Sequence, residues 1–85
     1  MKKYYLKLNK INDIKNFIKR ISSIESDGFI RTEDRKYCVD AKSIMGIFSL
    51  DLTKTLILEI NNEEEQFIKD IEDMGIAIKP ISLGD

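Results

Sequence analysis

Residues 40–50 read DAKSIMGIFSL, and they carry the clearest structural signal in the chain. Ser43 stands directly before a run of apolar residues, and serine is a favoured N-cap because its hydroxyl accepts from a free backbone N–H of the first turn. The stretch therefore predicts a short helix over residues 44–50. Large apolar side chains crowd this helix, so they cannot all face one core. We expect Ile47 and Leu50 to be the buried ones.

The other side of this helix is predicted to carry Ile44, Met45 and Phe48. An exposed apolar surface that includes a flexible methionine is typical of a protein-binding site. The alternative is that Phe48 folds back into the core, since a small domain has little apolar surface to spare. The exposure of Phe48 separates the two interpretations.

Outward from this helix, the apolar pattern switches between the period of a strand and the period of a helix. Period-two alternation predicts four strands, over residues 3–8, 29–32, 36–39 and 56–60. Apolar residues at three- and four-residue steps predict two longer helices, over residues 11–24 and 63–74. A capping box at residues 62–65 would open the second of these, and Gly75 would end it.

These elements follow the order βαββαβα, with one apolar face on each. Such elements imply a two-layer α+β domain, because each apolar face must be covered by another layer. The pattern does not decide the order of the strands. Residues 76–85 are apolar enough to pack against the domain, and an extra strand is one option for them.

The composition is that of one small globular domain. The chain has 85 residues, with 14 basic and 15 acidic side chains and a net charge of −1. Balanced charge gives no strong attraction for nucleic acid or an anionic membrane. No apolar run approaches the roughly 20 residues of a membrane span. We therefore expect a cytoplasmic protein with no direct nucleic-acid partner and no membrane partner.

Chemistry-bearing residue types are scarce in this chain. It has no histidine and one cysteine, Cys38, which we interpret as a small core residue rather than a reactive thiol. A lone thiol fits a reducing cytosol. There is no spaced acid cluster, no glycine-rich phosphate loop and no catalytic triad pattern. We expect no metal, no cofactor, no small-molecule substrate and no enzymatic activity.

The element order and the run Lys42-Ser43-Ile44-Met45-Gly46, followed by Ser49-Leu50, resemble the HPr family of the bacterial sugar phosphotransferase system. The resemblance covers residues 1–75, and residues 76–85 would be an extension packed on or near this domain. It implies an open-faced β-sandwich, in which three helices cover one face of a four-stranded antiparallel sheet.

The resemblance also implies roles for residues within the stretch 40–50. Ser43 matches the serine that HPr kinase/phosphorylase modifies in many Gram-positive bacteria. Ile44, Met45 and Phe48 match an exposed docking patch for phosphotransferase enzymes, the kinase and a LacI-type repressor.

The chain departs from the family in its first helix, where HPr proteins carry a His-x-Arg-Pro active site. Asn12, Ile14 and Lys15 stand at the histidine, arginine and proline positions. Phosphoryl relay needs a nucleophile such as imidazole, and an amide nitrogen cannot act as one because its lone pair is delocalised into the carbonyl. We interpret Asn12 as the N-cap of this helix.

Our leading hypothesis is a catalytically silent HPr-like module of the phosphotransferase system. It would regulate or bind protein partners, possible ones being HPr kinase/phosphorylase and a LacI-type repressor, and phosphorylation of Ser43 would switch it. The alternative is a repurposed HPr-fold interaction domain with no phosphotransferase role. A phosphocarrier that uses another residue is a third option, but no side chain near the first helix has suitable chemistry.

Overall fold

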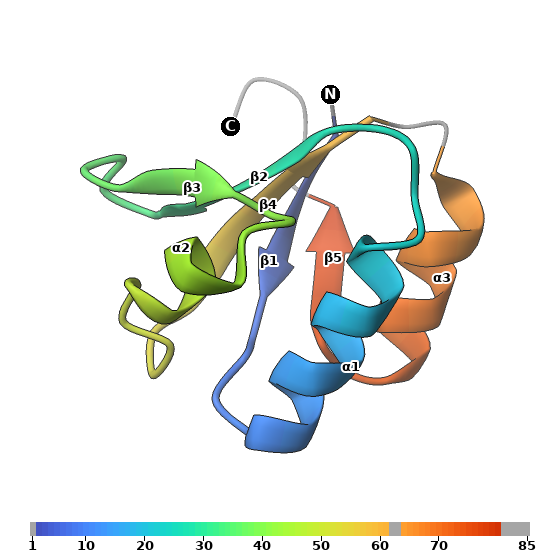
Figure 1. Cartoon of the computed structure of the whole chain (residues 1–85), viewed down its shortest axis with the longest axis horizontal. Coiled ribbons are helices and arrows are strands. Elements are labelled where there is room, and N and C mark those ends of the chain that lie inside the picture. Colours follow the sequence, from blue (N-terminus) through green and yellow to red (C-terminus); the bar gives the residue numbers. More distant parts are fainter. Residues whose placement is uncertain (1, 62–63, 81–85) are drawn as a thin grey trace.

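The computed structural model describes residues 2–61 and 64–80, and they form five strands and three helices (Figure 1). The chain runs through β1 (Lys2–Leu6), α1 (Ile11–Ile21), β2 (Gly28–Thr32), β3 (Cys38–Asp40), α2 (Ile44–Phe48), β4 (Leu56–Ile60), α3 (Glu65–Asp73) and β5 (Ala77–Pro80). The fold class is α+β, as the sequence predicts. No helix in the described ranges is long and apolar enough to cross a bilayer.

The strands form one sheet in the order β3-β2-β4-β1-β5, and every neighbouring pair is antiparallel. At the centre of the sheet, Leu58 of β4 lies opposite Tyr4 of β1 and Ile30 of β2. The expected number of strands was four. The fifth, β5, comes from the segment that the sequence left unplaced, and it pairs with β1 in a register that sets Ala77 opposite Leu6. Residues 81–85 of the expected extension lie outside the described residues.

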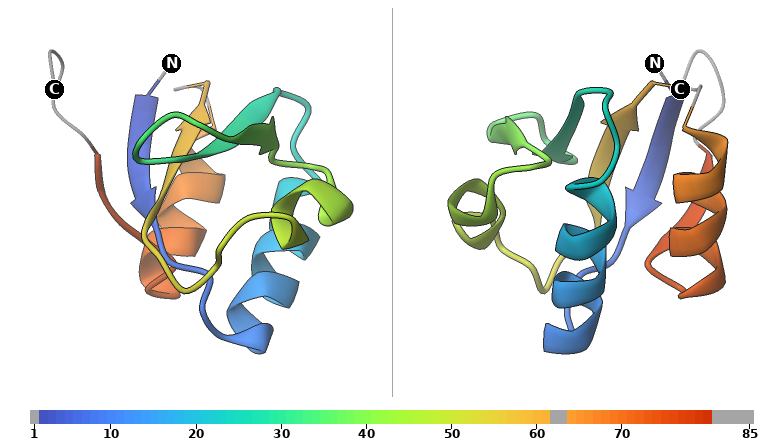
Figure 2. Two further views of the ribbon diagram at one scale, coloured as in Figure 1. Left: turned by 90° about the vertical axis from the view of Figure 1, so that its left-hand side faces the viewer. Right: turned by 45° about the vertical axis from the view of Figure 1, so that its right-hand side comes forward.

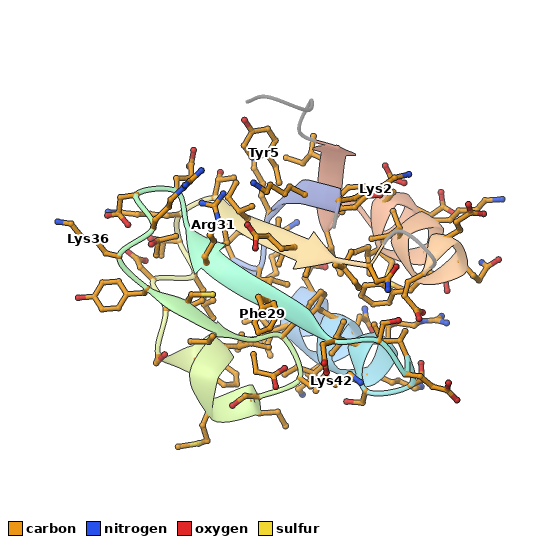
Figure 3. The ribbon with its side chains drawn as sticks, turned by 90° about the horizontal axis from the view of Figure 1, so that it is seen from above. Lys2, Tyr5, Phe29, Arg31, Lys36 and Lys42 are labelled. Atoms are coloured by element: carbon orange, nitrogen blue, oxygen red, sulfur yellow. The ribbon has the colours of Figure 1, made fainter. Side chains whose placement is uncertain are left out.

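The three helices lie on one face of the sheet, and the core fills the space between the two layers (Figures 1 and 2). The alternation of the strands explains this arrangement, because successive side chains point to opposite faces. Figure 3 looks onto the other face, which carries Tyr5, Phe29 and Arg31. There Glu59 accepts a hydrogen bond of 3.0 Å from Nε of Arg31 and lies 3.9 Å from Nζ of Lys3.

Helices α1 and α3 pack side by side (Figure 2), and an edge-to-face contact between Phe17 and Phe67 joins them at 5.9 Å between ring centroids. Among the described residues, the fully buried large side chains are Phe17, Leu6, Leu8, Ile21, Ile30, Ile47, Leu56, Leu58, Ile60, Ile71 and Ile76. They come from strands and helices alike, so the domain is built around one shared core.

The ends of the long helices test three predictions. Gly75 ends α3 at φ +78°, and the N–H groups of Gly75 and Ile76 donate to the carbonyls of Glu72 and Ile71. This is a Schellman cap, so the predicted end of α3 is confirmed. Half of the predicted capping box, residues 62–63, lies outside the described residues. Glu64 is the N-cap of α3, and its side chain makes no capping hydrogen bond.

The start of α1 differs from the prediction. The N-cap is Lys10, whose backbone is extended at φ −116° and ψ 140° and whose side chain makes no capping hydrogen bond. Asn12 lies inside the first turn and cannot act as the N-cap, because that residue must be non-helical. Ile11 is 71 % exposed, so the buried stripe begins at Ile14 rather than at Ile11.

Candidate functional site

The connection from β3 to α2 is held by short-range hydrogen bonds. The carboxylate of Asp40 accepts from the backbone N–H of Lys42 at 2.9 Å, and the carbonyl of Asp40 accepts from the N–H of Ser43 at 3.0 Å. The ammonium group of Lys42 donates to the carbonyl of Ile24 at 2.7 Å, which ties this turn to the segment between α1 and β2. These bonds therefore hold the turn before α2 in shape and also attach it to the segment between α1 and β2.

Ser43 is the N-cap of α2, as predicted. Its backbone is extended at φ −93° and ψ 109°, and its Oγ accepts from the backbone N–H of Gly46 at 3.0 Å. The hydroxyl therefore satisfies one of the N–H groups that a helix leaves unpaired at its start. Ser43 is half-buried.

Gly46 allows α2 to pack closely on β3, a role that the sequence did not reveal. A Cβ atom at this position would lie 3.0 Å from Cβ of Val39 and 3.2 Å from Oγ of Ser43. Both distances are shorter than nearly all real contacts of a Cβ atom, so a side chain here would require Val39 or Ser43 to give by a few tenths of an ångström. The absence of a side chain at Gly46 therefore determines how closely α2 packs on β3.

The apolar side chains of α2 divide between core and solvent as predicted. Ile47 is fully buried and Leu50, just after the helix, is buried as well. The other three large side chains are exposed, with relative exposures of 50 % for Ile44, 83 % for Met45 and 58 % for Phe48. The alternative in which Phe48 enters the core is wrong. We call the surface formed by Ile44, Met45 and Phe48 the α2 patch.

The α2 patch is apolar over the whole length of its helix. Neither the first nor the last turn of α2 carries an acidic or a basic residue. Three large apolar side chains on five helical residues exceed what a solvated helix normally shows, because such a helix alternates apolar with charged positions. A surface of this kind fits contact with a protein, where apolar side chains and methionine are enriched in the buried centre.

The three residues that the resemblance aligns with the HPr active site lie on α1, on a different element from the patch. Asn12 is exposed and its side chain makes no hydrogen bond with the residues that are described. Ile14 is buried in the core and Lys15 is exposed. None of these positions offers an imidazole, and a side chain at the core position of Ile14 would not present a cation to solvent.

The interpretation of Cys38 as a core residue is wrong. Cys38 is exposed on β3, a strand of three residues at the edge of the sheet. In such a strand the middle residue alone turns to the opposite face, and Val39 takes that position against α2. Cys38 lies opposite Arg31 in the ladder, a cationic neighbour that the sequence did not indicate.

Two carboxyl groups in loops have a lowered pKa. The pKa of Asp51 is lowered chiefly by the hydroxyl of Thr53, which donates to Oδ1 at 2.6 Å, and then by the Thr53 backbone N–H. Asp34, in the turn between β2 and β3, has its pKa lowered in the same way by Thr32 and Lys36. Both groups brace their own loops.

One further pKa shift lies under α3. The pKa of Tyr4 is raised, chiefly by burial and then by the negative charges of Glu72 and Glu65. Its hydroxyl therefore stays protonated at any physiological pH, and it supplies no base.

The described residues contain no group of three or more side chains that could hold a metal ion. No protein-family model, curated protein or solved structure matches this chain.

Proposed function

We propose that this protein is a catalytically silent, HPr-like regulatory or protein-binding module of the phosphotransferase system that acts through the α2 patch. The observation that carries the proposal is the exposure of Ile44, Met45 and Phe48 on a helix whose other side is locked into the core. A rigid, apolar and uncharged surface is suited to docking on a protein.

The arrangement of the elements supports an HPr-like layout. The chain from β1 to α3 follows the βαββαβα order of that family, and the helices lie on one face of the sheet (Figure 1). The additional strand β5 joins the edge beyond β1, whereas α2 packs beside β3 at the opposite edge. An added strand at that place leaves the α2 patch uncovered.

The loss of phosphoryl transfer follows from the chemistry of α1. Asn12 stands where the family carries its histidine, and an amide cannot form a reactive phosphoramidate by simple attack. A module without transfer chemistry acts only through its shape and charge. Its effect is then a change in the fraction of the partner that is bound.

Phosphorylation of Ser43 would switch the α2 patch. A phosphoserine at this position would add about −1.5 to −2 charges next to Ile44 and Met45. An anion is tolerated at the start of a helix, so phosphorylation would change the surface and leave the fold in place. Docking that depends on desolvated apolar side chains would weaken against an acidic partner and strengthen against a basic one.

The first experiment measures modification of the full chain by HPr kinase/phosphorylase and ATP. Intact mass should rise by one phosphate in the wild type and stay unchanged in Ser43→Ala, with Ser49→Ala as the matched control that still gains it. No gain in the wild type would favour an interaction domain without a phosphotransferase role. Transfer from phosphoenolpyruvate through enzyme I would contradict a silent module.

The second experiment measures binding of the purified chain to HPr kinase/phosphorylase and to a LacI-type repressor by calorimetry. Met45→Asp and Phe48→Asp should each weaken binding at least about tenfold, since burying an unpaired carboxylate at an interface costs well over 1.4 kcal/mol. Ile78→Asp on β5 changes an exposed isoleucine at the other edge of the sheet and serves as the control. Equal affinity in all three variants would remove the α2 patch as the docking surface.

A further inference from the structure

A small cavity lies between the end of β1 and the loop that leads from α2 into β4. It has a volume of about 160 Å³ and is lined by Lys7, Asn9, Leu52, Thr53, Lys54 and Thr55. The pairing of β1 with β4 accounts for its position: Leu6 lies opposite Leu56, so the residues that follow β1 and those that precede β4 must meet. The cavity belongs neither to the α2 patch nor to the positions of the lost active site.

Both walls of this cavity are held by hydrogen bonds. The backbone N–H of Lys7 donates to the carbonyl of Ile76 at 2.8 Å, which continues the pairing of β1 beyond its last residue. On the other wall, Asp51 accepts from the N–H and the hydroxyl of Thr53, and its carbonyl accepts from the N–H of Lys54 at 3.3 Å. The loop is therefore braced before any ligand arrives, which reduces the entropy lost on binding.

The lining is positively charged. Lys7 and Lys54 contribute two cations, and no acidic side chain lines the cavity. Neither ammonium group forms an ion pair with a described residue, in contrast to Lys3, which lies 3.9 Å from Glu59. Asp51 and Asp34 both lie within electrostatic range of Lys54, but neither carboxylate lines the cavity, and Oδ1 of Asp51 already accepts from Thr53.

Uncharged donors complete the lining. The side chains of Asn9 and Thr55 make no hydrogen bond with the described residues, so an amide N–H₂ and a hydroxyl remain available. The volume is several times the roughly 30 Å³ that one water molecule occupies in the liquid, which is enough for a tetrahedral anion. Two ammonium groups and two neutral donors in the lining of one cavity match the oxygens of such an anion.

We infer that this cavity, which we call the β1–β4 anion site, binds a small phosphate-type oxyanion. Lys7 and Lys54 would neutralise its charge, and Asn9 and Thr55 would donate to its oxygens. The ligand is either free phosphate or the phosphoryl group of a small phosphomonoester, because the cavity holds one phosphoryl group and little more. Lys7 and Lys54 lie far apart in the sequence, and the pairing of β1 with β4 brings them together.

The test follows the amide NMR signals of the labelled full chain during titration with inorganic phosphate at constant ionic strength. The amides of Asn9 and of residues 53–55 should shift and saturate, whereas chloride at the same ionic strength should leave them unchanged. Methyl phosphate in a second titration separates the two sources of the ligand: tighter binding of the ester assigns the site to phosphomonoesters, and tighter binding of phosphate assigns it to the free ion.

Three charge-matched variants decide whether the lysines act as a site. Lys7→Gln and Lys54→Gln should each raise the dissociation constant for phosphate about tenfold, because each removes one cation at contact distance. Lys15→Gln removes the same charge from the exposed face of α1 and should leave the dissociation constant unchanged. Shifts that never saturate, or an equal loss of binding in all three variants, would overturn the proposal and leave general charge screening.

Discussion

Helices α2 and α3 lie in the same layer of the molecule, yet they use their apolar residues in opposite ways. In α3, Phe67, Ile68 and Ile71 are buried, and its remaining residues are polar. In α2, the only buried residue is Ile47, while Ile44, Met45 and Phe48 face solvent. The need for a core explains every apolar residue of α3 and only one of those in α2.

The contrast between the two helices shows at which positions folding no longer constrains the sequence. A helix that only had to close the core would carry polar residues at its exposed positions, because exposed apolar side chains add nothing to stability and promote association. The three residues of the α2 patch therefore need a second explanation, and contact with a partner supplies it. If that explanation is right, stability and exposed chemistry are separate in α2.

The largest expected effect comes from one substitution made in both helices. Ile71→Ala should lower the free energy of unfolding by about 2–5 kcal/mol, since it leaves a cavity in the core. Ile44→Ala should cost less than about 1 kcal/mol, because half of that side chain is already exposed. Urea unfolding at equilibrium measures both. Similar losses in the two variants would mean that Ile44 belongs to the core and not to the patch.

Glycines give the second comparison, because each helix depends on one for a different reason. Gly46→Ala should destabilise the protein by about 1–2 kcal/mol, since contact strain against Val39 outweighs the gain in helix propensity. Gly75→Ala should cost about 1 kcal/mol through its positive φ, with no contact involved. Met45→Ala, on the exposed side of α2, is the control for propensity. A Gly46→Ala variant as stable as the wild type would contradict the close packing of α2 on β3.

Ser43 caps α2 with its side chain, whereas the N-cap of α3 makes no such bond. Ser43→Ala should therefore cost about 1 kcal/mol, while Glu64→Ala should cost little through capping. Ser43→Asp keeps an acceptor at the cap and should recover most of the stability. Thermal unfolding of the three variants checks this order. If Ser43→Asp is no more stable than Ser43→Ala, the hydroxyl is not acting as a cap.

The predictions from the sequence were correct for those features that a few neighbouring residues determine. The cap at Ser43, the buried Ile47 and the glycine end of α3 each depend on a few neighbouring residues and on rules that hold in any helix. The exposure of the α2 patch followed from counting apolar residues against the space available. All of these features depend on residues that lie close together in the sequence.

The failures share a different cause, which is pairing between distant segments. Cys38 is exposed because β3 ends the sheet and turns Val39 towards α2, and no local pattern reports which strand is last. Strand β5 depends on its register with β1. The prediction that Asn12 is the N-cap of α1 failed for a local reason, because a helix with the same buried stripe could begin after either Lys10 or Asn12. The β1–β4 anion site could not be predicted, because only the strand order shows that Lys7 and Lys54 line the same cavity.

Acid should loosen the loop that follows α2. Asp51 has a lowered pKa in the folded chain, so its ionised form contributes stability that is fully present above its ordinary pKa of 3.8. That contribution is lost as pH falls below 3.8 through the lowered folded pKa. Amide signals of residues 52–54 followed by NMR should report this step, and Asp51→Asn should abolish it. A step of equal size in the variant would assign it to another carboxyl group.

The smallest expected effect is the one that best separates stability from surface chemistry. Met45→Asp replaces the most exposed side chain of the α2 patch in the first turn of its helix, where the dipole favours a negative charge. It should change the free energy of unfolding by less than about 0.5 kcal/mol, as surface substitutions do. Phe67→Asp, at a buried position of α3, should instead prevent stable folding. A large loss of stability in Met45→Asp would mean that the α2 patch is part of the core. The contrast between the two helices would then carry no functional meaning.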